Sequence, residues 1–153
     1  MSLSDYLSDD RIILLIEATT RDTVLDAAAR LLGNASQAAT ASIAHGLRQR
    51  EKMGNTAIGH GVAIPHGRSD AFDTIRAAFL RLQPAVDFQA ADDEPVDLVF
   101  AMAVPAHDTQ QHLRLLSELA ERFGDPGFRA VLRTAANVDE LRAALLHPAL
   151  TIA

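Results

Sequence analysis

The sequence predicts one α/β domain over residues 1–153, in which a mixed β-sheet is flanked by helices on both faces. Short apolar runs rich in β-branched residues alternate with amphipathic segments of helical period along the chain. No linker, repeat or low-complexity tract interrupts this alternation, and the length of 153 residues suits one domain with a closed core. The order of the strands does not follow from these patterns.

The first third of the chain predicts a strand and two helices. Ile12–Ile16 is a short β-branched run bounded by polar residues, which favours a buried strand. We expect Asp22 to cap the following helix and Gly33 to end it. A second helix is expected from a cap at Ser36 to about Arg50, since its apolar residues recur at helical spacing.

The middle of the chain predicts two longer strands. Ile75–Leu82 is apolar around Phe79 and is expected to form the first of them. Val96–Val104 is almost entirely apolar, which is typical of a strand in the middle of a sheet with both faces covered. Pro105 is expected to end this second strand.

Three helices are expected after that strand. Asp108 is expected to cap an amphipathic helix that runs to about Phe123. A short helix should begin at Asp125-Pro126, because proline is tolerated at the first helical position. Asn137 with Glu140 resembles a capping box for a last helix, which Pro148 follows.

Composition excludes several classes of function. The chain has no cysteine, which removes disulfides, thiolate metal sites and a cysteine nucleophile. Its 14 basic and 20 acidic residues give a net charge of −6, so nucleic acid is not an expected partner. No targeting segment is recognisable and the apolar runs are too short to span a bilayer, so we expect a cytosolic protein without direct membrane insertion.

The most informative stretch is Gly54–Gly67, which holds four of the eight glycines. It is neither a P-loop, because no Gly-Lys-Ser/Thr follows, nor a dinucleotide fingerprint, because the third glycine is missing. Val62–Ile64 resembles a short strand that Pro65 ends, which would leave His66 at a strand exit. From spacing alone, His66 is either an exposed loop residue or a functional one.

A second histidine follows a second strand that ends at proline. His112 lies one turn into the helix after Pro105, and sites in α/β sheets gather at strand exits and helix N-termini. It also lies on an apolar helical stripe with Leu115, Leu116 and Leu119. It is therefore either a core residue or a partner of His66, while His45 and His147 are expected on helix surfaces.

A metal site or a hydrolase is not expected from the histidine spacing. His60 and His66 are six residues apart and His107 and His112 are five apart, so neither pair has the i, i+4 spacing of helical metal ligands. The acidic run Asp92–Glu94 is expected to be a solvated turn, and no nucleophile elbow is present. We therefore expect no metal and no other cofactor; His60 and His107 are expected at most to border the site.

A histidine without these partners still has one distinctive chemistry, which is to carry a phosphoryl group on a ring nitrogen. One ring nitrogen must then be free of its proton, which a hydrogen bond to the other nitrogen ensures. Donor or cationic groups must face the phosphoryl oxygens. His66 is the candidate acceptor, and Arg50, Arg68 and His112 are the candidates for these groups.

The same residues resemble a known family. The runs Arg50–Thr56, Gly59–Gly67 and Pro95–Ala106, with His112-Leu113, are similar to the enzyme IIA domain of the fructose/mannitol type in the bacterial phosphotransferase system. The resemblance implies a mixed sheet flanked by helices. It also implies the roles of three residues: His66 as phosphoacceptor, His112 as its support and Arg50 in stabilising the phosphoryl group. We further expect Thr56, Gly67 and Arg68 to take part in binding.

Within that family, the stand-alone length and the Arg-Glu-Lys-Met-Gly run are similar to the nitrogen-regulatory branch. That likeness implies a histidine phosphocarrier protein as donor and regulated targets of the kinase or transporter type as partners. His60 departs from the asparagine common in the family and would add a third histidine near the site. Two alternatives stay open: a sugar-specific enzyme IIA that donates to a membrane permease, and a binding module of the same fold that is never phosphorylated.

Overall fold

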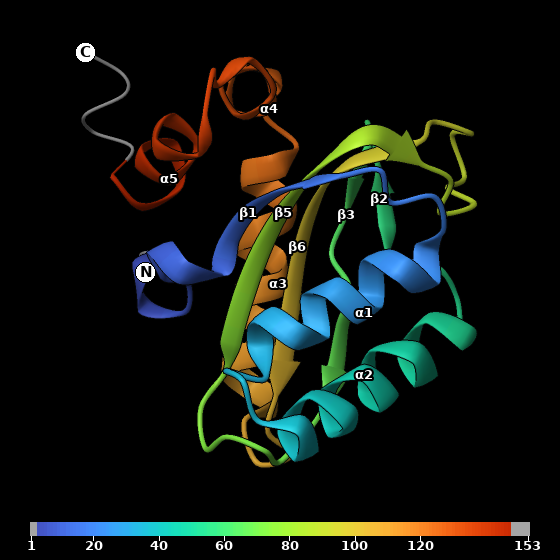
Figure 1. Ribbon diagram of the computed structural model, residues 1–153, viewed down its shortest axis with the longest axis vertical. Coiled ribbons are helices and arrows are strands. Elements are labelled where there is room, and N and C mark those ends of the chain that lie inside the picture. Colours follow the sequence, from blue (N-terminus) through green and yellow to red (C-terminus); the bar gives the residue numbers. More distant parts are fainter. Residues whose placement is uncertain (1–2, 148–153) are drawn as a thin grey trace.

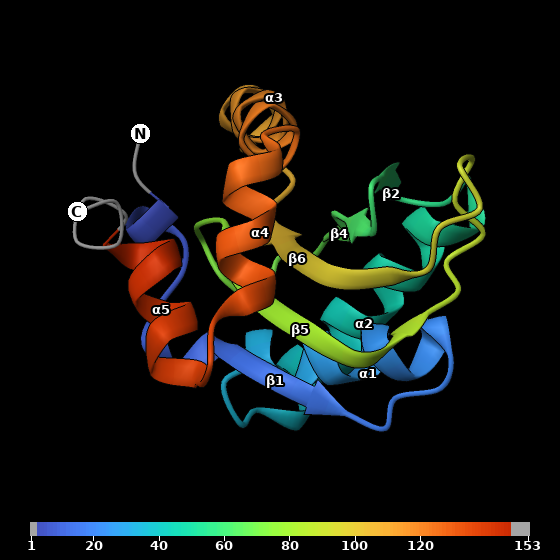
Figure 2. The same cartoon turned by 90° about the horizontal axis from the view of Figure 1, so that it is seen from above.

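In the computed structural model, which describes residues 3–147, one six-stranded mixed sheet separates two layers of helices (Figures 1 and 2). The strand order is β1-β5-β6-β3-β2, and β4 also pairs with β6. The strands have these bounds: β1 Ile12–Ile16, β2 Ala57–Gly59, β3 Val62–Ala63, β4 His66–Arg68, β5 Arg76–Val86 and β6 Val96–Val104.

Helices cover both faces of this sheet, as the sequence predicted. Figure 2 shows α1 and α2 on one side and α3, α4 and α5 on the other. The helices have these bounds: α1 Arg21–Leu32, α2 Gln37–Lys52, α3 Thr109–Phe123, α4 Pro126–Thr134 and α5 Val138–Leu146. Two short 3₁₀ turns, Leu3–Asp5 and Asp9–Arg11, precede β1. None of the helices between residues 3 and 147 combines the length and apolarity needed to cross a membrane.

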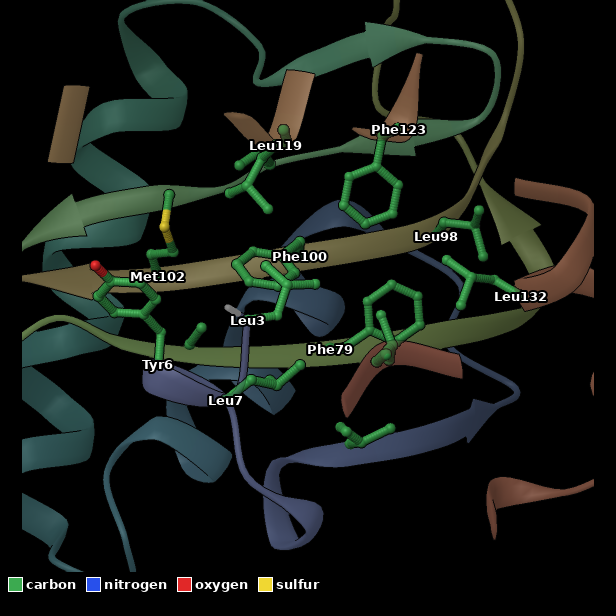
Figure 3. Close-up of a cluster of buried hydrophobic side chains, with 14 of the residues drawn as sticks. Leu3, Tyr6, Leu7, Phe79, Leu98, Phe100, Met102, Leu119, Phe123 and Leu132 are labelled. Atoms are coloured by element: carbon green, nitrogen blue, oxygen red, sulfur yellow. The ribbon is translucent and has the colours of Figure 1, made fainter. Parts of the chain in front are cut away.

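The central strand is β6, which confirms the prediction made from its apolar sequence. It pairs antiparallel with β5 and parallel with β3 and β4. Its alternate side chains enter two separate cores. On the α3 side, Phe100 faces Phe123, which stacks on Phe79 with ring centroids 6.3 Å apart (Figure 3). On the other side, Val99 packs in a cluster with buried residues of α1 and α2.

Helix starts agree with the sequence at most positions. Two predicted caps are confirmed, because the side chains of Ser36 and Asn137 each accept a hydrogen bond from a backbone N–H in the first turn. The helix predicted at Asp125-Pro126 is also confirmed, and there the Asp125 side chain accepts from Gly127 N. The predicted Asp22 cap is wrong, since α1 begins one residue after Thr20, whose hydroxyl accepts from Thr23 N. Asp108 occupies the N-cap position of α3, but its side chain makes no capping bond. Pro148 lies outside the described residues.

Two strand predictions need correction. The predicted strand Ile75–Leu82 corresponds to β5, which begins one residue later and continues to Val86. The predicted strand Val62–Ile64 corresponds to β3, which ends at Ala63. His66 was expected at a strand exit, yet the Pro65 carbonyl accepts from Met102 N at 2.9 Å and His66 begins the next strand, β4. Proline lacks only the N–H, so its carbonyl still joins the ladder and the segment stays against β6.

Candidate functional site

His66 is the first residue of β4 and is held against the C-terminal half of β6. Ala63 is opposite Val99 and His66 is opposite Met102, so the chain keeps its register through Pro65. His66 is half-buried. It is therefore not the exposed loop residue that spacing allowed, because it begins a strand of the sheet and lines a cavity.

The ring of His66 has a defined orientation and tautomer. Its Nδ1 donates to the carbonyl oxygen of Ile64 at 2.9 Å, and a carbonyl can only accept. Burial lowers the pKa of His66, although the bond to Ile64 opposes this; the nearby Arg50 charge also contributes to the lowering. The neutral ring thus keeps its proton on Nδ1 and leaves the Nε2 lone pair free.

A close contact between two glycines brings α2 against β4. A Cβ on Gly67 would lie 2.3 Å from the carbonyl carbon of Gly46, and a Cβ on Gly46 would lie 2.4 Å from Arg68 O. Any side chain at either position would push the helix away. The contact places the last turn of α2, with Arg50, beside His66. Gly46 was not singled out from the sequence, where it is an isolated glycine within a helical pattern.

Five of the six predicted site residues line one cavity of about 420 Å³: His66, Gly67, Arg68, Arg50 and His112. Arg50 Nη1 donates to Gly54 O at 2.8 Å, and Arg68 Nη1 donates to Ala106 O at 3.1 Å. Among the described residues, no carboxylate lies within 4.0 Å of either guanidinium. Main-chain carbonyls therefore orient both cations without neutralising them.

His112 comes from the first turn of α3 and faces His66. The two ring centroids are 5.1 Å apart, and His112 is only 8% exposed. Burial, with the proximity of His66, lowers the pKa of His112 to about 4, so the ring is neutral at pH 7. Its Nδ1 is buried without a hydrogen-bond partner among the described residues. His112 is thus buried, as its stripe predicted, and also adjacent to His66.

Thr56 lies apart from the main cavity and is bonded to a residue that the sequence reasoning missed. Its backbone N and its hydroxyl donate to the two carboxylate oxygens of Glu51, at 2.8 and 2.7 Å. Both residues are buried. Thr56 lines a smaller hollow of about 240 Å³ that also borders His66 and Arg50. Glu51 therefore ties the end of α2 to the segment leading into β2.

The other histidines are distributed differently from the expectation. His45 is on the surface of α2, as predicted, but it also lines the cavity of His66. His60 does not, because its positive φ of 58°, between Gly59 and Gly61, turns it towards a second cavity. His107 is exposed and lines neither cavity. No group of three or more potential metal-binding side chains occurs in residues 3–147.

Large apolar side chains stand exposed around the cavity. Met53, which follows α2 and lines the cavity, is 84% exposed, and Leu113, the residue after His112 in α3, is also exposed. Ile58 on β2 is exposed at the rim of the smaller hollow. Such residues, next to two unneutralised arginines, are typical of a surface that receives another protein.

Comparison with known proteins gives a consistent result. The family model described as "Phosphoenolpyruvate-dependent sugar phosphotransferase system, EIIA 2" matches residues 5–147. A nitrogen regulatory protein of Klebsiella oxytoca is 43% identical over 122 residues, which are 78% of this chain and 72% of that protein. One from Bradyrhizobium diazoefficiens is 30% identical over the full length of both chains. The crystal structure of nitrogen regulatory protein IIA-Ntr from Neisseria meningitidis superposes with a TM-score of 0.85 at 36% identity, covering 94% of this chain and 98% of that one.

Proposed function

Since this chain belongs to the EIIA type 2 family of the phosphotransferase system and is homologous to nitrogen regulatory proteins, we propose that it is a regulatory phosphohistidine carrier. In this proposal, His66 accepts a phosphoryl group from a histidine phosphocarrier protein. The phosphorylation state then controls the binding of partner proteins. The cytosolic location expected from the sequence is part of the same proposal.

The observation that carries the proposal is the bond from His66 Nδ1 to Ile64 O. It leaves Nε2 as the nucleophile, and the lowered pKa of His66 keeps that nitrogen unprotonated at neutral pH. As the new P–N bond forms at Nε2, the P–N bond to the donor imidazole breaks. The proton on Nδ1 stays in its hydrogen bond to Ile64 throughout.

The groups around Nε2 suit the charge that arrives with the phosphoryl group. Arg50 and Arg68 line the cavity without a carboxylate partner, so their charge is available to phosphoryl oxygens. His112, neutral and 5.1 Å away between ring centroids, offers a further donor. Preorganised donors of this kind need no reorganisation when transfer occurs, which favours a fast step.

A regulatory output is supported by the 43% identity to the nitrogen regulatory protein of Klebsiella oxytoca and by the nitrogen regulatory protein of Bradyrhizobium diazoefficiens, which this chain matches over the full length of both. The 2-O-alpha-mannosyl-D-glycerate-specific EIIABC component of Escherichia coli is 31% identical, and this chain covers only 22% of it. Phosphorylation at His66 would add negative charge in the cavity that the exposed Met53 also lines. A target that pairs its own acidic groups with Arg50 and Arg68 would lose these pairs once the phosphoryl group occupies both cations. We therefore infer that such targets, of the kinase or transporter type, bind the unmodified form.

The primary test is phosphoryl transfer from the phosphorylated phosphocarrier, followed by mass spectrometric location of the label. We expect an acid-labile, base-stable adduct on His66 alone and none in His66→Ala. His107→Ala is the matched control, because His107 is exposed and lines neither of the hollows beside His66, and it should be labelled normally. Label on another residue, or undiminished labelling of His66→Ala, would refute the assignment.

The regulatory part has a separate test. His66→Asp places a permanent charge at the site, whereas His66→Ala does not, so a target that prefers the unmodified form should bind the alanine variant more tightly. Equal affinity of a target for wild type and both variants would exclude a charge switch. Efficient transfer onward to a sugar-specific enzyme IIB would instead favour the sugar-transport alternative.

A further inference from the structure

A second cavity, which the proposed phosphoryl transfer does not use, lies towards the other end of β6. It has a volume of about 590 Å³ and is enclosed by the turn between β2 and β3, the segment before β6, and α4. Asp97 lines it, whereas His66 pairs with Met102, so the two sites are separated by about 16 Å along the strand. No residue lines both cavities.

The distinctive feature of this second cavity is a buried cation. Arg129 of α4 is 9% exposed and donates from Nη1 to Phe123 O at 2.8 Å, the carbonyl at the end of α3. Its other N–H groups have no acceptor in the part of the chain that the structure describes, and no carboxylate there lies within 4.0 Å. These nitrogens are not among the buried side-chain atoms without a partner, so they remain accessible to a ligand in the cavity. Arg129 is therefore suited to receive an anionic group of a ligand.

The neighbouring Arg133 is already neutralised and forms the wall of the cavity. Its guanidinium binds both carboxylate oxygens of Asp97, at 2.9 and 2.8 Å, and also donates to His60 O at 2.5 Å. A Cβ on Gly61 would lie 2.5 Å from Arg133 Nη2, so the glycine leaves room for this pair. The free positive charge of the cavity thus belongs to Arg129.

Negative charge lines the same cavity. Asp92 and Glu94 line the cavity, and both are exposed. Asp92 is held in place by hydrogen bonds from the backbone N–H groups of His60 and Glu94. A phosphate or another polyanion would be repelled by these carboxylates, whereas a cation alone would be repelled by Arg129.

We propose that this cavity binds a small zwitterion, an α-amino acid, with its carboxylate on Arg129 and its ammonium group facing Asp92 and Glu94. A guanidinium can bind a carboxylate in bidentate fashion, and an ammonium group needs the acceptor-only oxygens that the two acids supply. Ala85 and Pro95 add apolar wall for a side chain. The proposal does not depend on phosphoryl transfer at His66.

The test is a titration of ¹⁵N-labelled protein with a panel of L-amino acids, followed through backbone amide shifts. Two matched probes remove one charge each: the N-acetyl derivative lacks the ammonium group, and the methyl ester lacks the carboxylate. We expect at least one amino acid to give saturable shifts at Gly61 and Glu94, and both of its derivatives to bind at least about tenfold more weakly. Absence of saturable shifts with every amino acid, or equal binding of either derivative, would overturn the proposal.

Variants add an independent criterion. Glu94→Gln removes an exposed charge and should weaken binding, whereas the adjacent Asp93→Asn, at an exposed residue that does not line the cavity, should not. Arg129→Met should abolish binding, and because it also removes the bond to Phe123, Arg129→Lys provides the folded comparison with a shorter reach. Unchanged affinity in both Glu94→Gln and Arg129→Lys would refute the assigned contacts. His66→Ala should bind the amino acid normally.

Discussion

Replacing His112 with alanine should slow phosphoryl transfer to His66 far more than it weakens the fold. The ring is neutral at pH 7, because its pKa is lowered to about 4, and it therefore carries one proton. An N–H at the buried Nδ1 would have no acceptor among the described residues. We infer that the proton is on Nε2, which is then the donor available to a phosphoryl group on His66.

The magnitudes separate the two effects. Loss of the packed ring costs on the order of 2 kcal/mol. Removal of a buried nitrogen without a partner recovers about 1–3 kcal/mol, so the net change in unfolding free energy should be small. Loss of one preorganised donor typically slows a reaction about 100- to 1000-fold. Transfer should therefore fall by two to three orders of magnitude in a protein of nearly normal stability.

The assay compares single-turnover transfer rates and thermal midpoints of wild type, His112→Ala and His112→Gln. Glutamine should restore part of the rate, because its amide offers a donor in place of the imidazole N–H. Ser117→Ala is the control, since Ser117 is exposed on the same helix and lines neither of the hollows beside His66. A lower midpoint with an unchanged rate per folded molecule would show that His112 is only a core residue.

Three further outcomes follow from the structure. Gly67→Ala should lower the thermal midpoint and the transfer rate together, because its Cβ would meet the backbone of Gly46 at 2.3 Å; a normal midpoint would contradict the close approach. Glu51→Gln should weaken the two bonds from Thr56 and slow transfer several-fold, and a rate equal to that of wild type would remove Glu51 from the site's support. Between pH 7 and pH 5 the wild type should lose about 2 kcal/mol of unfolding free energy through His112. The pKa of this histidine is 6.5 in the unfolded chain and about 4 in the folded protein, so the unfolded chain binds more protons as the pH falls. Denaturant titrations of His112→Gln should show a shallower dependence of unfolding free energy on pH.

The fold was predictable wherever side chains alone determine an element. The apolar run of β6 identified the central strand, and the caps at Ser36 and Asn137 marked helix starts. The sequence patterns did not predict β4, because this strand has only three residues and includes Gly67 and Arg68, which are not typical of a buried strand. It is a strand only because it pairs with β6. Strand order depends on such long-range pairing, which local periodicity does not contain.

The sequence patterns predicted that His66 and His112 lie close together, but not how the residues around them are arranged. Each histidine follows a predicted strand that ends at a proline, and this pattern predicted that the two would lie near one another. The distance of 5.1 Å between the ring centroids of His66 and His112 confirms it. His60 is only six residues from His66, yet it lies at another cavity because the turn before β3 reverses the chain. Glu51 resembled an ordinary helix surface charge, and only the path of the chain after α2 buries it against Thr56.

The charges of the site explain how one surface can serve both transfer and regulation. Arg50 and Arg68 are oriented by carbonyl oxygens, so the unmodified site carries two positive charges beside two neutral imidazoles. An arriving phosphoryl group largely cancels this charge, so the phosphorylated state is stabilised without being trapped by a carboxylate network. Had both arginines been paired with acids, the phosphoryl group would have met a neutral site. The same loss of positive charge, beside the exposed Met53, is what a partner protein would sense.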